Sequence, residues 1–134
     1  STEVQHRYPL PWRYFGEGLT VVNDNIMVLT WQAETLLVLD KSNLQLKRTL
    51  RYQGEGWGLA WDGTHLLRSD GSDRITWHDP NTMAVIRHIK VHDVWGAVRR
   101  LNELEWAQGI IFANIWKSDR LLLIHEFGCL ITYV

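Results

Sequence analysis

The sequence predicts an all-β fold built from repeated units, and three observations lead to this prediction. Short runs rich in β-branched and aromatic residues are separated by clusters of Gly, Asp, Asn and Ser, which is the pattern of strands joined by tight turns. No segment keeps a helical period over three turns. The chain also repeats itself at intervals of about 40 to 45 residues, the length of a four-stranded β-propeller blade.

The repeat is clearest in three short segments that are versions of one another: Glu17-Gly18-Leu19, Trp57-Gly58-Leu59 and Asn102-Glu103-Leu104. Trp31 and Trp116 follow the first and third segments at the same spacing, and Asp70 follows the second at one position less. Equivalent positions in successive blades converge on a shared axis. The first residue of each segment is therefore predicted to line one pocket, although these residues are far apart in the sequence.

Each unit divides into four predicted strands. In the first unit, residues 15–53, they are Gly18–Asn23, Ile26–Trp31, Leu36–Asp40 and Leu44–Leu50. In the second, residues 54–100, they are Gly58–Trp61, His65–Ser69, Arg74–His78 and Ala84–Val91. In the third, residues 101–134, they are Glu103–Trp106, Ile110–Trp116, Leu121–His125 and Leu130–Val134, with the last turn at Phe127-Gly128. Runs such as Leu36–Leu39 are apolar on both faces, which is typical of sheets packed on both sides.

The first 14 residues are predicted to supply the outer strand of a preceding blade, at Thr2–Leu10. One chain then holds three blades and a single further strand, which is too little to close a propeller ring. Three alternatives remain open at this stage. The chain is a fragment, two or more chains complete a ring, or the three units pack in a compact arrangement that is not a ring.

Charge and composition exclude several classes of protein. The 134 residues carry 14 Lys and Arg against 15 Asp and Glu, so no strong field indicates nucleic acid or an anionic membrane as a partner. No apolar run approaches the ~20 residues that cross a bilayer, and residues 1–5 lack the pattern of a signal peptide. The single cysteine, Cys129, excludes an internal disulfide. Histidines at unrelated spacings predict no metal site.

Six motifs in one order resemble the glutaminyl cyclases of the plant and bacterial type, the five-bladed propeller glutamine cyclotransferases. They are Phe15–Thr20, Leu29–Trp31, Gly54–Leu59, Ser69–Ser72, Leu101–Glu105 and Ala113–Trp116. The resemblance covers nearly all of this chain but only about the middle half of a typical member. The blade with a Phe-x-Gln-Gly motif and a later region that supplies a lysine to the pocket have no counterpart here.

The resemblance implies an activity and a set of residues. Family members cyclise the N-terminal glutamine of peptides to pyroglutamate and release ammonia, without a catalytic zinc or another cofactor, and they are secreted, periplasmic or vacuolar. Carried over by position, it implies catalytic roles for Glu17 and Asn102. It also implies that the substrate is bound by four aromatic side chains: Phe15, Trp31, Trp57 and Trp116. The expected partners are a peptide with an N-terminal glutamine and a second copy or complementary chain.

These residue types suit the reaction, in which the α-amine attacks the γ-carboxamide carbon of the same residue. An aromatic-walled pocket can hold the side chain curled toward its own amine, and orientation of this kind lowers barriers by up to ~7–11 kcal/mol. The amine, with a pKa of ~7.7–8, must lose a proton before it attacks. Glu17 is the candidate acceptor, and Asn102 the candidate donor to the developing oxyanion.

Other residues are predicted to be structural. Glu55 lies in the same Gly-Glu-Gly triplet as Glu17 but aligns with Phe15, two positions before the pocket position. Asp70 is expected to form a hydrogen-bonded turn, and Asn114 either to join the site or to satisfy a strand end. The remaining tryptophans are expected to pack between sheets: Trp12, Trp61, Trp77, Trp95 and Trp106. The alternative function is a non-catalytic propeller fragment that acts as a binding or assembly module.

Overall fold

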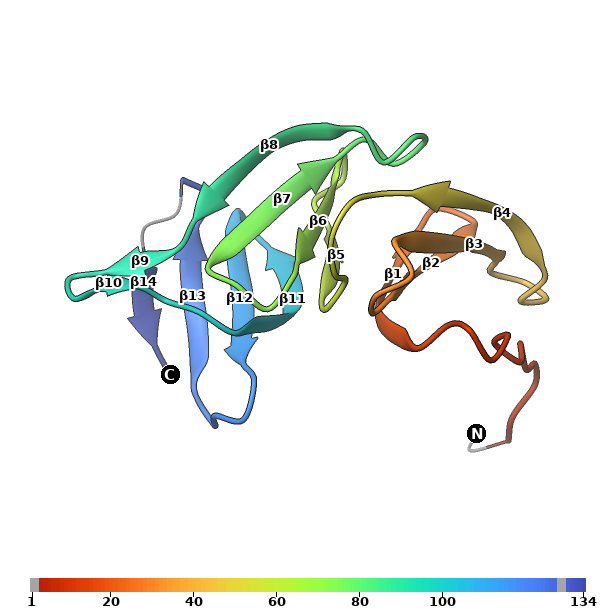
Figure 1. The fold of residues 1–134 in the computed structure, drawn as a ribbon, viewed down its shortest axis with the longest axis horizontal. Helices are drawn as coiled ribbons and strands as arrows, with labels where there is room; N and C mark the ends of the chain where they lie inside the picture. The colour runs from red at the N-terminus through yellow and green to blue at the C-terminus, as the bar shows by residue number, and fades with distance from the viewer. Residues whose placement is uncertain (1–2, 128–129) are drawn as a thin grey trace.

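The computed structural model describes residues 3–127 and 130–134, and these residues form strands and turns with no helix. Three four-stranded antiparallel sheets follow one another along the chain, each with its strands in sequence order. Figure 1 shows them side by side, from the orange and yellow first sheet to the blue third sheet. The first strands of the three sheets are neighbours, because β1 contacts β5 and β5 contacts β11. The predicted all-β class is confirmed.

The strands match the predicted ones to within two residues at each end. The first sheet consists of β1 (Gly16–Val22), β2 (Asn25–Thr30), β3 (Thr35–Asp40) and β4 (Leu46–Arg51). The second consists of β5 (Leu59–Trp61), β6 (Leu66–Ser69), β7 (Arg74–His78) and β8 (Val85–Lys90). The third consists of β11 (Leu101–Ala107), β12 (Ile110–Ile115), β13 (Leu121–His125) and β14 (Leu130–Tyr133). A small hairpin that the sequence did not predict, β9 (His92–Asp93) and β10 (Gly96–Ala97), precedes the third sheet.

Two apolar cores lie between the three sheets. Side chains of the first and second sheets form one cluster, which includes Leu36, Val38 and Leu66. Side chains of the second and third form a larger cluster, which includes Trp77 and Ile111. Burial of such side chains is the main favourable term in folding, at ~25 cal/mol per Å². Consecutive sheets are therefore held together by the same apolar strands that the sequence marked as buried.

The N-terminal segment corrects the predicted strand at Thr2–Leu10. Thr2 lies outside the described residues, and residues 3–15 form no strand. Instead Tyr8 and Tyr14 pack against Leu37 and its neighbours on the outer face of the first sheet. The physical reason is that a strand needs a hydrogen-bonding neighbour, and the prolines at positions 9 and 11 also lack the N–H that pairing requires.

Two tryptophans correct the prediction that they pack between sheets. Trp12 is 95% exposed in the turn before β1, and Trp95 is 88% exposed between β9 and β10. Trp77 is buried, and Trp61 and Trp106 pack against the cores, as predicted. The prediction for Trp12 and Trp95 was wrong because it rested on residue type alone, whereas both residues lie in turns that project from the sheets.

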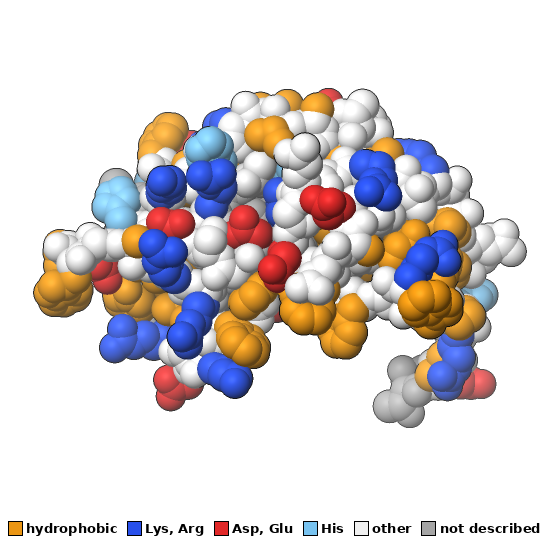
Figure 2. Space-filling view, viewed as in Figure 1, with side chains coloured by type: hydrophobic (Ala, Val, Ile, Leu, Met, Phe, Trp, Pro, Cys, Tyr) orange, Lys and Arg blue, Asp and Glu red, His pale blue; other side chains and the backbone are white. Residues whose placement is uncertain are grey.

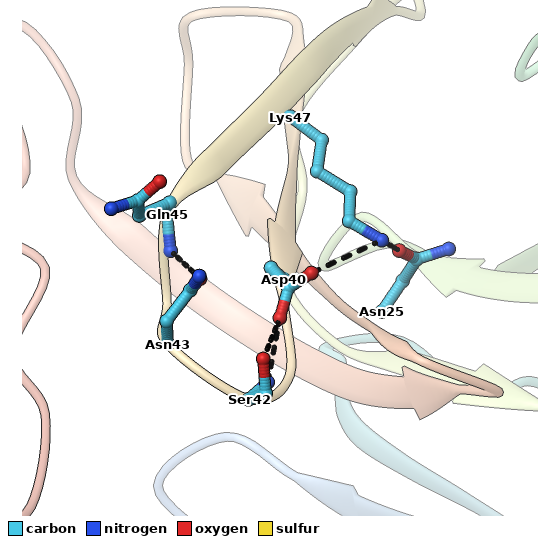
Figure 3. Close-up of polar contacts among 6 residues, drawn as sticks. All are labelled: Asn25, Asp40, Ser42, Asn43, Gln45 and Lys47. Atoms are coloured by element: carbon cyan, nitrogen blue, oxygen red, sulfur yellow. Dashed lines mark hydrogen bonds and ion pairs between the residues drawn. The ribbon is translucent and has the colours of Figure 1, made fainter.

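The turn between β3 and β4 shows how short polar side chains fix the strand connections (Figure 3). Asp40 Oδ1 accepts hydrogen bonds from the backbone N and the hydroxyl of Ser42, at 2.8 and 2.5 Å, and these bonds lower the pKa of the Asp40 carboxyl. Lys47 Nζ donates to Asn25 Oδ1 at 2.7 Å and lies 3.6 Å from Asp40 Oδ2. Asp79 Oδ1 likewise accepts from the backbone N of Asn81 and Thr82 in the turn before β8. The first two sheets therefore repeat an aspartate-centred turn between their third and fourth strands. The predicted turn at Phe127-Gly128 lies partly outside the described residues.

A buried polar network lies beside the contact between the first two sheets. Arg68 on β6 is 6% exposed; its Nε donates to His78 Nε2 at 3.1 Å and its Nη1 donates to the Glu55 carbonyl at 2.6 Å. His78 Nδ1 lies 2.9 Å from the Met83 carbonyl, so Nδ1 carries the proton and Nε2 accepts. The Arg68 guanidinium also lies 4.8 Å from the centre of the Tyr52 ring. Burial, with the Arg68 charge beside it, lowers the pKa of His78 to about 4, so its ring is neutral at pH 7.

The neutral ring of His78 makes stability depend on pH. In the unfolded chain His78 takes up a proton as the pH falls through 6.5, whereas in the native state it does so only near 4. We therefore expect the free energy of unfolding to lose about 3 kcal/mol from this group as the pH falls from 7 to 4. Urea denaturation at a series of pH values measures this loss. His78→Gln keeps an acceptor for Arg68 but does not titrate, so its curve is expected to be flatter, and parallel curves would contradict the assignment.

Candidate active site

One candidate residue lies at or just before the first strand of each sheet, and in two of the sheets an irregularity in the register places it. In the first sheet Glu17 and Gly18 together oppose one residue of β2, because the register shifts between Gly16 and Leu19. In the third sheet Asn102 and Glu103 oppose one residue of β12 in the same way. In the second, Trp57 and Gly58 both hydrogen bond to the backbone of Ser69. Bulges of this kind turn a side chain out of the normal alternation and are frequent beside active sites.

The structure brings all six predicted site residues together. One hollow of about 280 Å³ is lined by Phe15, Glu17, Trp31, Trp57, Asn102 and Trp116. These residues come from all three sheets or from the turns beside them, so the hollow exists only because the first strands of the sheets converge. The positions of Glu17, Trp57 and Asn102 agree with the repeat alignment, and the roles of all six residues remain a prediction.

The aromatic wall of the hollow consists of two edge-to-face pairs. Phe15 and Trp31 have ring centroids 6.0 Å apart at 68°, and Trp57 and Trp116 have centroids 5.7 Å apart at 76°. Phe15 is 66% exposed, Trp31 40% and Trp116 45%. The pairs therefore present ring surface to solvent where a ligand can reach it. Aromatic surface of this kind attracts an ammonium group by ~0.5–2 kcal/mol per ring.

Glycines allow the strand backbones behind the hollow to approach each other closely. A Cβ on Gly18 would lie 2.7 Å from the backbone N of Leu59, and one on Gly58 would overlap the carbonyl oxygen of Asn102. The buried hydroxyl of Ser69 completes this contact, since it accepts from Gly58 N at 2.8 Å and donates to the Asn102 carbonyl at 2.5 Å. Asn102 is thereby held at a fixed position relative to the second sheet.

Two neighbouring carboxyl groups, Glu17 in the hollow and Glu103 beside Asn102, have raised pKa values. Burial raises the pKa of the Glu17 carboxyl above its usual value. Burial also raises the pKa of Glu103, and the charges of Glu17 and then Glu105 add to this effect. Glu17 and Glu103 are therefore close enough to repel each other when both are ionised. The sequence did not single out Glu103, although its place beside Asn102 in a bulge is a visible signal.

The residues predicted to be structural have specific partners. Asp70 Oδ1 accepts from the backbone N of Ser72 at 3.0 Å, which confirms the predicted turn. Asn114 Oδ1 accepts from the backbone N of Glu103 at 2.8 Å and so fills the bulge of β11. Glu55 does not line the hollow, but its Oε1 accepts from the indole nitrogens of Trp31 and Trp57. Sequence reasoning missed this contact.

Within residues 3–127 and 130–134, His, Cys, Asp and Glu form no group of three or more that could hold a metal ion. In the same residues there is no helix long and apolar enough to span a membrane. The hollow itself is lined by a carboxylate, an amide and four aromatic rings.

Comparison with known proteins identifies close relatives. The family model described as glutamine cyclotransferase matches residues 1–132. The glutaminyl-peptide cyclotransferase of Arabidopsis thaliana is 39% identical over 107 residues, which are 79% of this chain and 33% of that protein. The crystal structure of Myxococcus xanthus glutaminyl cyclase superimposes with a TM-score of 0.85 at 37% identity, over 90% of this chain and 52% of that one.

A more distant likeness concerns the fold alone. Kuenenia stuttgartiensis hydrazine synthase superimposes with a TM-score of 0.63 at 12% identity, over 88% of this chain and 35% of that one. The chain thus spans about a third of its plant relative and about half of its bacterial one.

Proposed function

Because the chain belongs to the glutamine cyclotransferase family, we propose that it takes part in cyclising the N-terminal glutamine of peptides to pyroglutamate, with release of ammonia. One observation carries the proposal. The carboxylate, the amide and the aromatic side chains that this chemistry requires line a single hollow, although they come from three separate sheets. The plant relative is named for this reaction, and the bacterial one for glutaminyl cyclisation.

Binding the substrate is the first task of the hollow. The peptide's terminal ammonium would lie against the ring faces of Trp31, Trp57 and Trp116. The glutamine side chain would be confined between the aromatic pairs and curled toward its own amine. The reaction is intramolecular, so this confinement supplies much of the acceleration by replacing a search among many conformers with one reactive conformer.

The proton transfers fall to Glu17 and the charge stabilisation to Asn102. Glu17 takes a proton from the α-ammonium, whose nitrogen then attacks the γ-carboxamide carbon and forms the new C–N bond. The amide of Asn102 donates to the oxygen on which negative charge develops. When the tetrahedral intermediate collapses, the bond to the former amide nitrogen breaks, and Glu17 returns its proton to that nitrogen so that neutral ammonia leaves. The attacking nitrogen loses its second excess proton to solvent, which leaves the neutral lactam. The raised pKa of Glu17 suits a group that must both accept and return a proton.

Ammonia release tests the proposal directly. The purified protein is incubated with a short peptide that begins with glutamine, and ammonia is measured against the spontaneous rate. We expect release above that rate from this peptide and none from the same peptide acetylated at its N-terminus, because the acetyl group removes the nucleophile. A folded protein that binds the free peptide without releasing ammonia would overturn the catalytic proposal and favour the non-catalytic binding module.

The arrangement of the sheets supports a further part of the proposal. We propose that residues 15–53, 54–100 and 101–134 are consecutive propeller blades and that another copy or a complementary chain completes the ring. The adjacency of β1, β5 and β11 supports this arrangement. Figure 2 shows hydrophobic side chains exposed along the lower edge of the molecule, where association would cover them. A native mass in solution equal to that of one chain would contradict completion of the ring by a second copy.

Family membership also leads us to propose a secreted or periplasmic location.

A further inference from the structure

A single carboxylate oxygen connects the two halves of the aromatic wall. Glu55 Oε1 accepts a hydrogen bond from Trp31 Nε1 at 2.7 Å and a second from Trp57 Nε1 at 3.1 Å. Trp31 follows β2 of the first sheet, and Trp57 precedes β5 of the second. The two indole rings therefore share one acceptor although they belong to different sheets.

The connection extends to all four aromatic side chains of the hollow. Phe15 packs edge-to-face on Trp31, and Trp116 packs edge-to-face on Trp57. The two inner rings, those of Trp31 and Trp57, are both hydrogen bonded to Glu55. The orientation of each outer ring, Phe15 or Trp116, thus depends on an inner ring. Because an indole has a single N–H donor, losing this acceptor leaves no other side-chain bond to set the angle of either inner ring.

The backbone around Glu55 is held in place independently of its carboxylate. Its carbonyl oxygen accepts from the buried Arg68 at 2.6 Å, and the backbone N of Gly56 donates to the Trp31 carbonyl at 2.9 Å. The backbone N of Gly54 donates to Glu34 Oε2 at 2.7 Å. The carboxylate is therefore presented to the indoles from a loop that has its own anchors, and its removal need not unfold that loop.

We propose that Glu55 is a positioning residue that orients the aromatic wall of the site through its two bonds to Trp31 and Trp57. For the reaction it acts through the rings and not on the reacting atoms, because its side chain does not line the hollow. The kinetic part of this inference rests on the proposed cyclisation, whereas the part that concerns ring orientation does not.

The bonds are tested by NMR of the indole N–H groups, which needs no activity. Trp31→Phe and Trp57→Phe assign the two signals among those of the eight tryptophans. In Glu55→Ala both signals are expected to move upfield and to exchange faster with solvent, whereas Glu55→Gln retains an acceptor oxygen and is expected to preserve them. Signals that stay unchanged in Glu55→Ala would overturn the inference, whether or not the protein proves to be an enzyme.

Kinetics test the consequence for substrate. Misplacement of a bound group by about 1 Å can slow a reaction by ~10²-fold, so we expect kcat/KM to fall by about this factor in Glu55→Ala and by only a few-fold in Glu55→Gln. Glu34→Ala is the matched control, because it removes a different anchor of the same loop. Equal losses in Glu34→Ala and Glu55→Ala would show that the loop as a whole matters, which would overturn a specific role for the Glu55 carboxylate. A wild-type protein without activity would instead overturn the proposed function and leave the NMR result to decide the inference.

Discussion

Replacement of Glu17 with glutamine is expected to lower kcat for cyclisation by about 10²- to 10⁴-fold, the usual contribution of a general acid–base group. The substitution keeps the size of the side chain and one acceptor oxygen, but it replaces the other oxygen with an NH2 donor and removes the ability to accept a proton. KM is expected to change little, because four of the six side chains that line the hollow are aromatic and are proposed to make most of the contact with the substrate. Ammonia release from a peptide that begins with glutamine measures both constants.

Two further measurements make the test of Glu17 specific. Glu126→Gln removes a carboxylate whose partner is Arg87 and which lies outside the hollow, so its activity is expected to match the wild type. The second measurement is the dependence of activity on pH, because burial raises the pKa of Glu17. Activity should therefore fall on the acid side at a higher pH than an ordinary glutamate would give. A Glu17→Gln variant with wild-type kcat would refute its role as the proton acceptor.

The substitution Gly58→Ala is expected to destabilise the protein by about 3–5 kcal/mol. The added methyl group would overlap the carbonyl oxygen of Asn102 and lie 2.9 Å from the Cα of Glu103, and both are backbone atoms that cannot rotate away. β11 would have to move, which would also break the hydrogen bonds that join Gly58 to Asn102 through Ser69. Urea denaturation measures the loss, and activity should fall with it because Asn102 moves.

A second glycine separates this steric effect from the general cost of replacing glycine. Gly63 has a φ of 97° in a turn, and a Cβ there would meet no atom within 4 Å. Gly63→Ala is therefore expected to cost only the backbone strain of a left-handed residue, about 1–2 kcal/mol. Gly58 lacks a positive φ, so its penalty comes from the contact alone. Equal losses in the two variants would show that the close approach of β5 and β11 is unimportant.

Much of the fold and the membership of the site could be predicted from the sequence, because both depend on a repeat. Glu17 and Asn102 lie in equivalent bulges at the start of β1 and β11, and Trp57 lies just before β5, so the repeat brings the three residues to one hollow. The predicted strands followed from short apolar runs and from turn residues, such as those at Asp40 and Asp79, which act over a few residues.

The wrong predictions concern contacts that no local pattern records. Trp12 and Trp95 were expected to pack, since tryptophan usually does, but each lies in a turn that projects into solvent. The N-terminal segment reads as a strand, but strand formation depends on a neighbour that offers free N–H and C=O groups. Whether such a neighbour exists is a property of the whole fold.

The sequence by itself determined the all-β class and most of the strands, because turn residues act locally, and its repeat brought Glu17, Trp57 and Asn102 to one place. The other three residues of the hollow followed from the resemblance to a known family. Only the tertiary structure decided which side chains hold those six in place. The bond of Glu55 to two indoles and the link through Ser69 join different sheets. Hydrogen bonds of this kind form within about 3 Å, and only the packing of one sheet against the next brings their donors and acceptors to that distance.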